Sequence, residues 1–481
     1  MENLYLIGSL LGLSLLLISV FNYTNYKPNP KLSTAKEREK CPPAPGTMGW
    51  PIIGETLDYY SNLRRGSLEK FVADRRNKYA SEVFTTSIIG YPMAILCGAE
   101  GNKLLFSNEN KLVQVWFPQS FRKLFSKSQD APKVRRILSA FLRSFTLHKF
   151  VGTIDSLMKH RIIQTLLQSE EAKAGRVASV YTMAVACRLL LGIDDPVKVE
   201  KLHQSVKDVA GGLVTMGVDL PGTGYNRAVK ATRSLSEELR PIVKQRRIDL
   251  LENRANQTKD ILSHMLLATD DDGKFLEDED IATYLLGLLH GGYEPTKAAI
   301  TFIIKYLAEL PLVYQKVLKE QTGITKTEGE NELLNWEDIS KMKYSWMVAN
   351  EVFRLTPPVL GTFREAIADF TFAGHTIQKG TKIHWTSHFT HRDPDCFPNP
   401  EKFDPSRFEG NGPPPYSFVP FGGGPRMCPA NEYTRCLVLV FMHNMVTKFR
   451  WDLLDPNEKV VYDPLPRPTQ GLPIRLHPRN P

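Results

Sequence analysis

The residues most able to do chemistry lie in the stretch PFGGGPRMCPANEYTR, residues 420–435, where Cys428 follows three glycines and an arginine. Free cysteine is most often a buried structural residue, so a functional role has to be argued from its setting. The apolar run at 436–446 predicts a buried helix, and Pro429 suits its first turn because proline has no N–H to leave unsatisfied. We therefore expect Cys428 at a helix N-terminus, where free N–H groups and the helix dipole stabilise a thiolate.

The residues before the cysteine indicate the kind of ligand. Gly422, Gly423 and Gly424 carry no side chains, so the backbone there can approach a broad, flat group. Arg426 offers a positive charge to an anion on the same group. A thiolate, a flat ligand and an anion-binding arginine together indicate haem iron bound through sulfur.

Residues of these types also occur in two other kinds of site, a phosphate-binding loop and the site of a cysteine nucleophile. A phosphate-binding loop needs a lysine followed by serine or threonine after its glycines, and that pair is absent. A cysteine nucleophile needs a histidine base, and several histidines are present, so this alternative stays open. It leaves the glycines and the arginine unexplained.

The segment FGGGPRMCPA resembles the haem-binding signature of the cytochrome P450 family, with Phe421, Gly424, Arg426 and Cys428 at the signature positions. The resemblance implies a mainly α-helical fold with small β-sheets, and a haem whose axial ligand is Cys428. Ala430 stands where the family usually has glycine, which is a difference of one methyl group.

Further segments agree with this resemblance. Glu351 and Arg354, in NEVFR, lie three residues apart on a helix that is too apolar for a solvated face, so their charges need buried partners. The resemblance supplies Arg407, in FDPSRF, as the third member of a structural core that holds the haem pocket. It also implies that Arg364 and Arg135 contact the haem.

A long helix is predicted at residues 278–309 from its apolar periodicity. Its segment HGGYEPTKAAIT resembles the family's oxygen-binding segment, in which Gly291 and Gly292 would open a groove beside the iron. The resemblance implies that Glu294 and Thr296 are the catalytic residues and relay protons during oxygen activation.

The same segment departs from the family at Pro295, where a threonine is usual. Proline removes a helix N–H and crowds the preceding turn, so we expect a kink there. The missing threonine favours an alternative function, a haem-thiolate isomerase or dehydratase that needs neither electrons nor dioxygen. A non-catalytic lipid-binding relative is a further alternative.

The overall composition narrows the class of protein. The 481 residues carry a net charge of +9 without a long basic run interleaved with aromatics, which argues against nucleic acid and favours a membrane surface or an acidic partner. Six cysteines without a CxxC pair indicate neither a disulfide framework nor a zinc site, so a reducing compartment is expected.

The N-terminus predicts a membrane anchor. Residues 4–21 are uncharged, Glu2 precedes them, and basic residues follow them, which is typical of a spanning helix with a cytosolic C-terminal side rather than of a cleaved signal peptide. We expect an anchor at residues 1–26, a charged and proline-rich linker at 27–50, and a haem-binding monooxygenase domain at 51–481.

The segments that line the substrate pocket in this family are apolar here, which favours a large lipophilic substrate that arrives from the bilayer. Trp116, Phe117 and Leu360 are the expected contacts. From about residue 41 onward, segments such as GWPIIGETLDYY and GLPIRLHP are similar to plant P450s that oxidise triterpenoids. This resemblance implies hydroxylation or successive oxidation of a dammarane- or amyrin-type skeleton at the endoplasmic reticulum, with NADPH electrons delivered by a separate P450 reductase.

Overall fold

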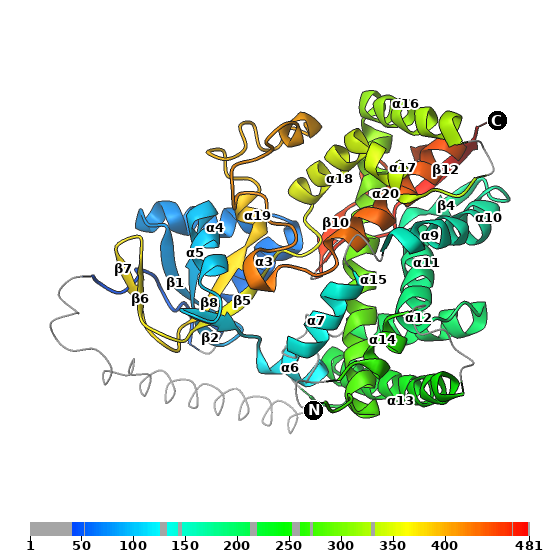
Figure 1. Cartoon of the computed structure of the whole chain (residues 1–481). Coiled ribbons are helices and arrows are strands. Elements are labelled where there is room, and N and C mark those ends of the chain that lie inside the picture. The colour runs from blue at the N-terminus through cyan, green and yellow to red at the C-terminus, as the bar shows by residue number, and fades with distance from the viewer. Residues whose placement is uncertain are drawn as a thin grey trace, which may run out of the picture. The chain divides into compact units, whose positions relative to one another are not determined.

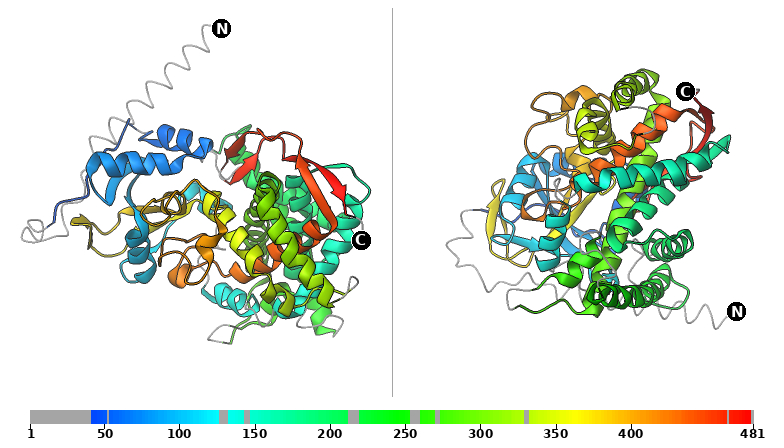
Figure 2. Two further views of the ribbon diagram at one scale, coloured as in Figure 1. Left: turned by 90° about the horizontal axis from the view of Figure 1, so that it is seen from above. Right: turned by 45° about the vertical axis from the view of Figure 1, so that its right-hand side comes forward.

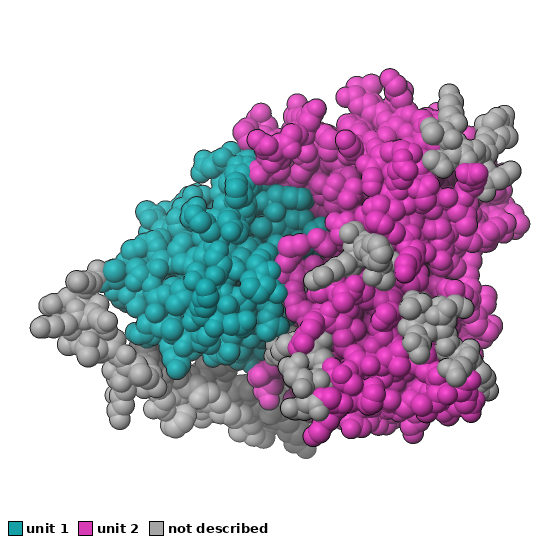
Figure 3. All heavy atoms as spheres, in the orientation of Figure 1, with its two compact units in different colours: residues 1–117, 361–397, 414–426 teal, residues 118–360, 398–413, 427–481 magenta. Residues whose placement is uncertain are grey.

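The computed structural model describes the chain from residue 41 onward, so the predicted anchor and most of the predicted linker lie outside the described residues. The described ranges are 41–51, 53–125, 132–142, 147–211, 219–252, 260–269, 273–328, 332–463 and 465–479. The chain divides into two compact units (Figure 3). Unit 1 comprises residues 1–117, 361–397 and 414–426, and unit 2 comprises residues 118–360, 398–413 and 427–481.

Unit 1 is built around a five-stranded sheet in the order β1-β2-β8-β5-β3 (Figure 1). Its strands are β1 (Val83–Ile88), β2 (Tyr91–Leu96), β8 (Lys382–Thr386), β5 (Gly361–Ala366) and β3 (Val113–Val115). The β2–β8 pair is parallel and the other pairs are antiparallel. The sheet packs its apolar side chains, including Ala94 and Ile383, against Leu105 and Phe106 of a neighbouring helix.

The first hairpin of this sheet turns through two residues. Ile89 and Gly90 both have positive φ, 54° and 74°, as a tight two-residue turn between right-twisted strands requires. The other elements of unit 1 are α3 (Thr56–Arg65), α4 (Leu68–Tyr79), α5 (Gly98–Ser107), α19 (Ser387–Thr390), the 3-10 turn η5 (Gly424–Arg426) and the small hairpin of β6 (Phe370–Phe372) and β7 (His375–Ile377).

Unit 2 is helical, and its centre is α15 (Asp278–Glu309), which is buried on most of its circumference (Figures 1 and 2). A helix that is apolar nearly all round is stable only inside a protein. The helices that pack against it include α11 (Ala174–Ala186), α12 (Pro196–Ala210), α13 (Gly224–Leu251), α18 (Lys343–Leu355) and α20 (Asn431–Lys448).

The remaining elements of unit 2 surround this bundle. Its other helices and helical turns are α6 (Gln119–Leu124), α7 (Pro132–Phe141), η1 (His148–Phe150), α9 (Val151–Leu157), η2 (Met158–Ile163), α10 (Gln164–Leu166), η3 (Cys187–Leu191), α14 (Ile261–Leu267), α16 (Pro311–Glu328), α17 (Trp336–Lys341) and η4 (Pro405–Phe408). Its two sheets are β4-β12-β9, from β4 (Glu171–Lys173), β12 (Pro473–Pro478) and β9 (Phe449–Leu453), and the hairpin of β10 (Val460–Tyr462) and β11 (Pro466–Pro468). The C-terminal strands β9 and β12 lie side by side in red in Figure 2.

The expectation of a mainly α-helical fold with small sheets is confirmed. The helix predicted at 278–309 has the same limits as α15, and it runs unbroken through Pro295. In unit 1, a turn at Ala373 and Gly374, both with positive φ, separates β6 from β7.

One described helical segment is long and apolar enough to cross a membrane, namely Ala174–Leu191, which forms α11 and η3. Because 78% of it is buried inside the fold, it has the character of a core helix.

Candidate functional site

Cys428 lies in unit 2, just before helix α20. The helix begins at Asn431 with Ala430 as its N-cap. Pro429 therefore lies just before the helix, whereas it was predicted to lie in the first turn. The backbone N–H of Ala430 and the charge of Arg135 both lower the pKa of the half-buried thiol, but desolvation is the larger effect and the pKa is raised. The N–H group of Ala430 thus acts in the expected direction, although loss of solvent outweighs it.

Arg135 and Cys428 are brought together in the same unit. Arg135 lies on α7, and its guanidinium donates a hydrogen bond to the main-chain carbonyl of Met427, the residue next to Cys428. A guanidinium keeps its proton in proteins, so this group brings a positive charge close to the sulfur.

The glycines of the motif lie in unit 1 and pack against Phe106, near the end of α5. A Cβ on Gly423 would come within 2.4 Å of the Phe106 ring, and one on Gly424 within 2.1 Å of its carbonyl oxygen. Gly422 and Gly424 also have φ values of +70° and +63°, which side chains disfavour. Packing against Phe106 and the backbone conformation are therefore enough to require glycine at these positions. The close approach of this backbone to a flat ligand stays a prediction. The role of Phe421, which is half-buried, stays a prediction too.

Arg364 and Arg426 of unit 1 share one buried carboxylate. Arg364 Nε donates to Glu109 Oε2 at 2.7 Å, and Arg426 Nε lies 3.9 Å from Glu109 Oε1. Arg364 also donates to the hydroxyl of Thr362 and the carbonyl of Phe363. Burial, opposed by Glu109 and reinforced by Arg426, lowers the pKa of Arg364, so the carboxylate does not fully compensate the solvation that the buried Arg364 loses.

Glu351, Arg354 and Arg407 come together in unit 2. Arg354 Nε and Nη2 donate to the two oxygens of Glu351 at 2.7 and 2.8 Å, and both side chains are fully buried. Arg407 Nε lies 3.5 Å from Glu351 Oε1, which also accepts the backbone N–H of Asp404 at 2.8 Å. Arg354 reaches the carbonyl of Lys402 as well. The cluster joins α18 to the loop that carries η4.

The glycines of α15 leave space on one side of that helix. A Cβ on Gly291 would have no heavy atom within 4 Å, and one on Gly292 would meet only the ring of Tyr433 on α20, at 4.0 Å. The hydroxyl of Tyr433 is buried and has no hydrogen-bond partner among the described residues. A buried hydroxyl without a partner indicates that a polar group or water belongs beside it.

The two residues expected to be catalytic differ in their contacts. Glu294 is buried, and its Oε2 accepts a hydrogen bond from Lys297 Nζ at 2.6 Å. The carboxylate is thus fixed by an ion pair with a lysine three residues later on α15. Thr296 is buried too, and within the described part of the chain its hydroxyl makes no hydrogen bond. The catalytic roles of both residues stay predictions.

The expected substrate contacts are distributed over both units. Trp116 packs edge-on against Tyr91 and Phe363 in unit 1, with Lys382 Nζ 5.3 Å from its ring centre. Phe117 is half-buried in unit 1, and Leu360 is buried in unit 2. The contacts of Trp116 account for its burial by packing, so contact of these three residues with substrate stays a prediction.

Comparison with known proteins identifies the family. The pattern of the Cytochrome P450 family matches residues 43–473, which is most of the chain. The chain belongs to the cytochrome P450 family. The assignment from the motif around Cys428 is thereby confirmed, and a cysteine-nucleophile enzyme is no longer an alternative.

Relatives and solved structures of this P450 agree. A Vitis vinifera protein named beta-amyrin 28-monooxygenase is 51% identical over 91% of this chain and 92% of its own length. A Platycodon grandiflorus protein named beta-amyrin 16-beta-monooxygenase is 49% identical over 91% of this chain and 93% of its own. The structure of retinoic acid bound cyanobacterial CYP120A1 matches with a TM-score of 0.81 and 29% identity, over 91% of this P450 and 100% of that chain. The resemblance to plant triterpenoid oxidases is confirmed.

The family implies haem, and the described residues fit it. Cys428 supplies a thiol that needs a cation to ionise, and no group of three or more described His, Cys, Asp or Glu residues could hold a metal by itself. In unit 1, the two cations Arg364 and Arg426 lie beside the single carboxylate of Glu109, a balance of charge that suits a propionate. The partnerless hydroxyl of Tyr433 fits a group that lies beside α15.

The sequence-based reasoning missed two residues of this P450. Glu109 has no local signal, because its partners Arg364 and Arg426 lie more than two hundred residues along the chain. Lys297 could have been found, because it stands three residues after Glu294 on a predicted helix, the spacing at which opposite charges pair.

Proposed function

We propose that this P450 oxidises a triterpenoid with the β-amyrin skeleton, using dioxygen and electrons that a separate reductase takes from NADPH. The observation that carries the proposal is sequence identity of 51% and 49%, over 91% of the chain, to two enzymes. Their names assign oxidation of beta-amyrin at carbon 28 and at carbon 16. Because the two identities differ by so little, the proposal covers the skeleton, and the carbon is what the experiment reads out.

Named side chains would hold the haem. When bound, haem supplies the activation of dioxygen and the insertion of one oxygen atom into a C–H bond. Cys428 would hold its iron through sulfur, with the positive charge of Arg135 beside that sulfur. Arg364 and Arg426 would bind its propionates.

Proton supply is assigned to Glu294. Its carboxylate is buried beside the open side of α15 at Gly291, and the ammonium of Lys297 fixes one of its oxygens. A carboxylate positioned in this way can accept a proton at its other oxygen and pass it on, which is the geometry that general acid catalysis requires. Thr296 contributes a hydroxyl nearby on the same helix.

Substrate orientation is assigned to apolar side chains. Trp116, Phe117 and Leu360 present apolar surface, as binding of a hydrocarbon skeleton requires. A triterpenoid offers few polar groups, so shape and excluded water decide which carbon is presented for reaction.

The location and the partner belong to the same proposal. Residues 1–26 anchor the enzyme in the endoplasmic reticulum membrane, residues 27–50 link the anchor to a cytosolic domain at 51–481, and a P450 reductase docks on that domain. The apolar, uncharged run at 4–21 followed by basic residues supports this topology. A membrane position also suits a substrate that partitions into lipid.

A haem-thiolate isomerase or dehydratase is the second candidate, because Pro295 replaces the threonine usual in monooxygenases of this family. Such an enzyme would form product without NADPH. This requirement separates the two candidates in a single control reaction.

The experiment is coexpression of this P450 with a plant reductase in yeast that makes α-amyrin, β-amyrin or a dammarane skeleton. Mass spectrometry of the extracts is expected to show a β-amyrin product heavier by one oxygen, or by the increments of further oxidation, only when the reductase is present. Isolation of that product gives the carbon. Products that form equally without reductase would favour the isomerase, and no product from any skeleton would overturn the proposal.

A further inference from the structure

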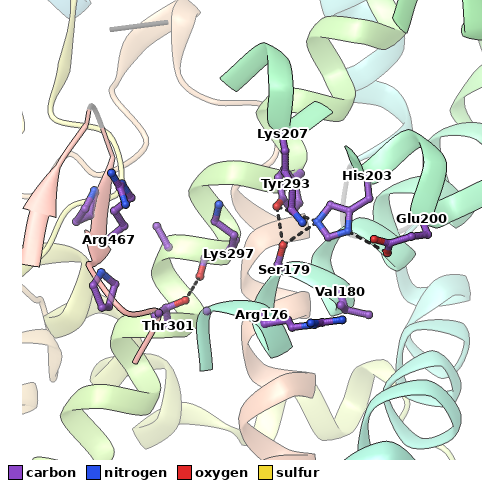
Figure 4. A pocket seen from close by; sticks show the side chains of 15 residues that line it. Arg176, Ser179, Val180, Glu200, His203, Lys207, Tyr293, Lys297, Thr301 and Arg467 are labelled. Atoms are coloured by element: carbon purple, nitrogen blue, oxygen red, sulfur yellow. Dashed lines mark hydrogen bonds and ion pairs between the residues drawn. The ribbon is translucent and has the colours of Figure 1, made fainter. Parts of the chain in front are cut away.

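A cavity lies within unit 2, and none of the site residues discussed above except Lys297 lines it. It has a volume of about 430 Å³, is open to solvent, and is lined by residues of α11, α12, α15 and the β10–β11 hairpin (Figure 4). Several charged and hydrogen-bonding side chains face it, in contrast to the wholly apolar surface that a triterpenoid needs. The cavity therefore calls for a different kind of ligand.

Its floor is a cluster of three buried hydrogen-bonding side chains. Ser179 Oγ lies 2.7 Å from His203 Nε2 and 2.6 Å from the hydroxyl of Tyr293, and His203 Nε2 lies 3.0 Å from the same hydroxyl (Figure 4). Burial, and after it the charge of Lys207, lowers the pKa of His203, so the imidazole is neutral at pH 7. The floor thus offers hydrogen bonds without a charge of its own.

The walls are rich in positive charge. Arg176, Lys207, Lys297 and Arg467 line the cavity, whereas Glu200 is the acidic residue among the lining side chains. Lys297 is paired with Glu294, and Arg467 lies 3.5 Å from Asp463.

Two of these cations have no counterion among the described residues. Arg176 and Lys207 form no ion pair there, and they come from two different helices, α11 and α12. Cations that line one cavity without a counterion repel each other, and an anion in the cavity relieves this repulsion.

We propose that this cavity binds a tetrahedral oxyanion, a phosphate group, between Arg176 and Lys207, and that the bound anion competes with Glu294 for Lys297. Two cations without an ion pair among the described residues match its double charge, and the neutral floor adds no negative charge that would repel it. The volume admits inorganic phosphate with some of its water, or a small phosphate ester.

The competition links the cavity to the oxygen helix. Lys297 Nζ holds Glu294 Oε2 at 2.6 Å, and any anion that draws the ammonium into the cavity loosens this pair. The coupling is reciprocal, so removal of the Glu294 charge must tighten phosphate binding by the factor with which phosphate weakens the ion pair. Phosphate binding itself does not depend on the proposed substrate, so the two proposals can fail separately.

The test is thermal unfolding of the full-length, haem-loaded enzyme in lipid nanodiscs, titrated with sodium phosphate and, at matched ionic strength, with sodium chloride. A ligand that binds only the folded state raises the unfolding temperature in a saturable way. Phosphate is expected to do so, and chloride is not. Arms with inorganic phosphate and glycerol phosphate show whether the free ion or an ester binds more tightly.

Matched variants locate the site. Arg176→Gln and Lys207→Gln are each expected to raise the apparent Kd for phosphate about tenfold or more, the change for loss of one charge-assisted hydrogen bond. Lys198→Gln, at an exposed position on α12 outside the cavity lining, is expected to leave it unchanged. Glu294→Gln is expected to lower the Kd several-fold, because Lys297 is then released.

The contrary results are equally definite. If phosphate acts no differently from chloride, the cavity is not an anion site. If saturable binding survives both the Arg176 and the Lys207 substitutions, the anion binds elsewhere and the proposal is wrong. If Glu294→Gln leaves the Kd unchanged, the competition for Lys297 does not exist.

Discussion

The environment of Cys428 disfavours a free thiolate. Desolvation raises its pKa, and the N–H of Ala430 and the charge of Arg135 offset this only in part. A metal ion bonded to the sulfur supplies the missing positive charge, which is how metals ionise thiols that solvent would leave protonated. Ligation of iron by Cys428, which the family motif implies, would therefore supply the charge that this environment lacks.

Replacing this ligand makes the first prediction. Cys428→Ser is expected to abolish the carbon monoxide difference band near 450 nm that thiolate-bound haem gives, while circular dichroism shows that the helices remain. Cys396→Ser, at a half-buried position in unit 1, is the control and is expected to keep the band. A Cys428→Ser protein with a normal band would mean that another residue binds the iron.

The buried cluster around Glu351 makes the second prediction. Glu351→Ala leaves Arg354 charged and fully buried, and breaking such a pair costs about 3–5 kcal/mol of stability. Arg407→Ala is expected to cost less, because that side chain is 12% exposed and lies 3.5 Å from Glu351. Urea unfolding followed by haem release measures both, with Lys343→Ala on the exposed surface of α18 as the control. Equal losses for Glu351 and Lys343 would contradict this account.

At the scale of elements, α15 carries the largest departure from the family. Pro295 lies inside an unbroken helix, and proline in a helix interior costs about 3 kcal/mol relative to alanine. The enzyme keeps a helix that is weakened beside Glu294, the residue to which we assign proton supply.

Substitutions at this position make the third prediction. Pro295→Ala and Pro295→Thr both restore the helix N–H, so both are expected to raise the unfolding temperature, and only threonine adds a hydroxyl. If Glu294 supplies the protons, product formed per NADPH is expected to differ by less than about twofold between these variants, far below the effect of a lost proton donor. A large gain in Pro295→Thr alone would show that the missing threonine limits this enzyme.

The junction of α3 with β5 and β8 makes the fourth prediction, which concerns pH. His384 on β8 bonds the hydroxyl of Tyr59 on α3 and the carbonyl of Thr362 on β5, and burial lowers its pKa from 6.5 to about 4. Between about pH 6.5 and about pH 4, His384 binds a proton in the unfolded chain but stays neutral in the folded protein. Stability from this group is therefore full above pH 6.5 and is lost as the pH falls toward 4.

Urea unfolding at two pH values tests this linkage. Between about pH 7 and about pH 4.5, the wild type is expected to lose about 2–3 kcal/mol more than His384→Gln, which has no titrating group there. The variant is less stable at neutral pH, so the comparison is of the two pH-dependent losses. If the wild type and the variant lose equal amounts of stability, His384 takes up its proton at the same pH in the folded and the unfolded protein.

At the scale of the whole molecule, local patterns predicted elements well and distant contacts poorly. The limits of α15 followed from its apolar periodicity, because a central helix repeats its burial every turn. The glycines at 422–424 were singled out correctly as special, but their partner Phe106 lies more than three hundred residues earlier, so no local pattern could name it. The start of α20 was predicted two residues too early, because proline is also common just before the first residue of a helix.

The same limit applies to the site. The motif identified Cys428 and the glycines because chemistry and backbone freedom leave local signals. Charge sharing between Arg364 and Arg426 depends on Glu109, and the cationic cavity depends on four separate elements, so both appear only when the chain is folded. Resemblance to a family recovered the arginine core, which spacing alone would have left as a surface ion pair.

The central claim is that this P450 transfers an oxygen atom from dioxygen to a triterpenoid. Its most direct test is incubation of the enzyme and a plant reductase with β-amyrin and NADPH under ¹⁸O₂, followed by mass spectrometry of the product. The account predicts a reductase-dependent product that carries one ¹⁸O atom for each hydroxyl gained. A product that forms without NADPH, or one that contains no ¹⁸O, would contradict it and leave isomerisation or dehydration as the chemistry of this enzyme.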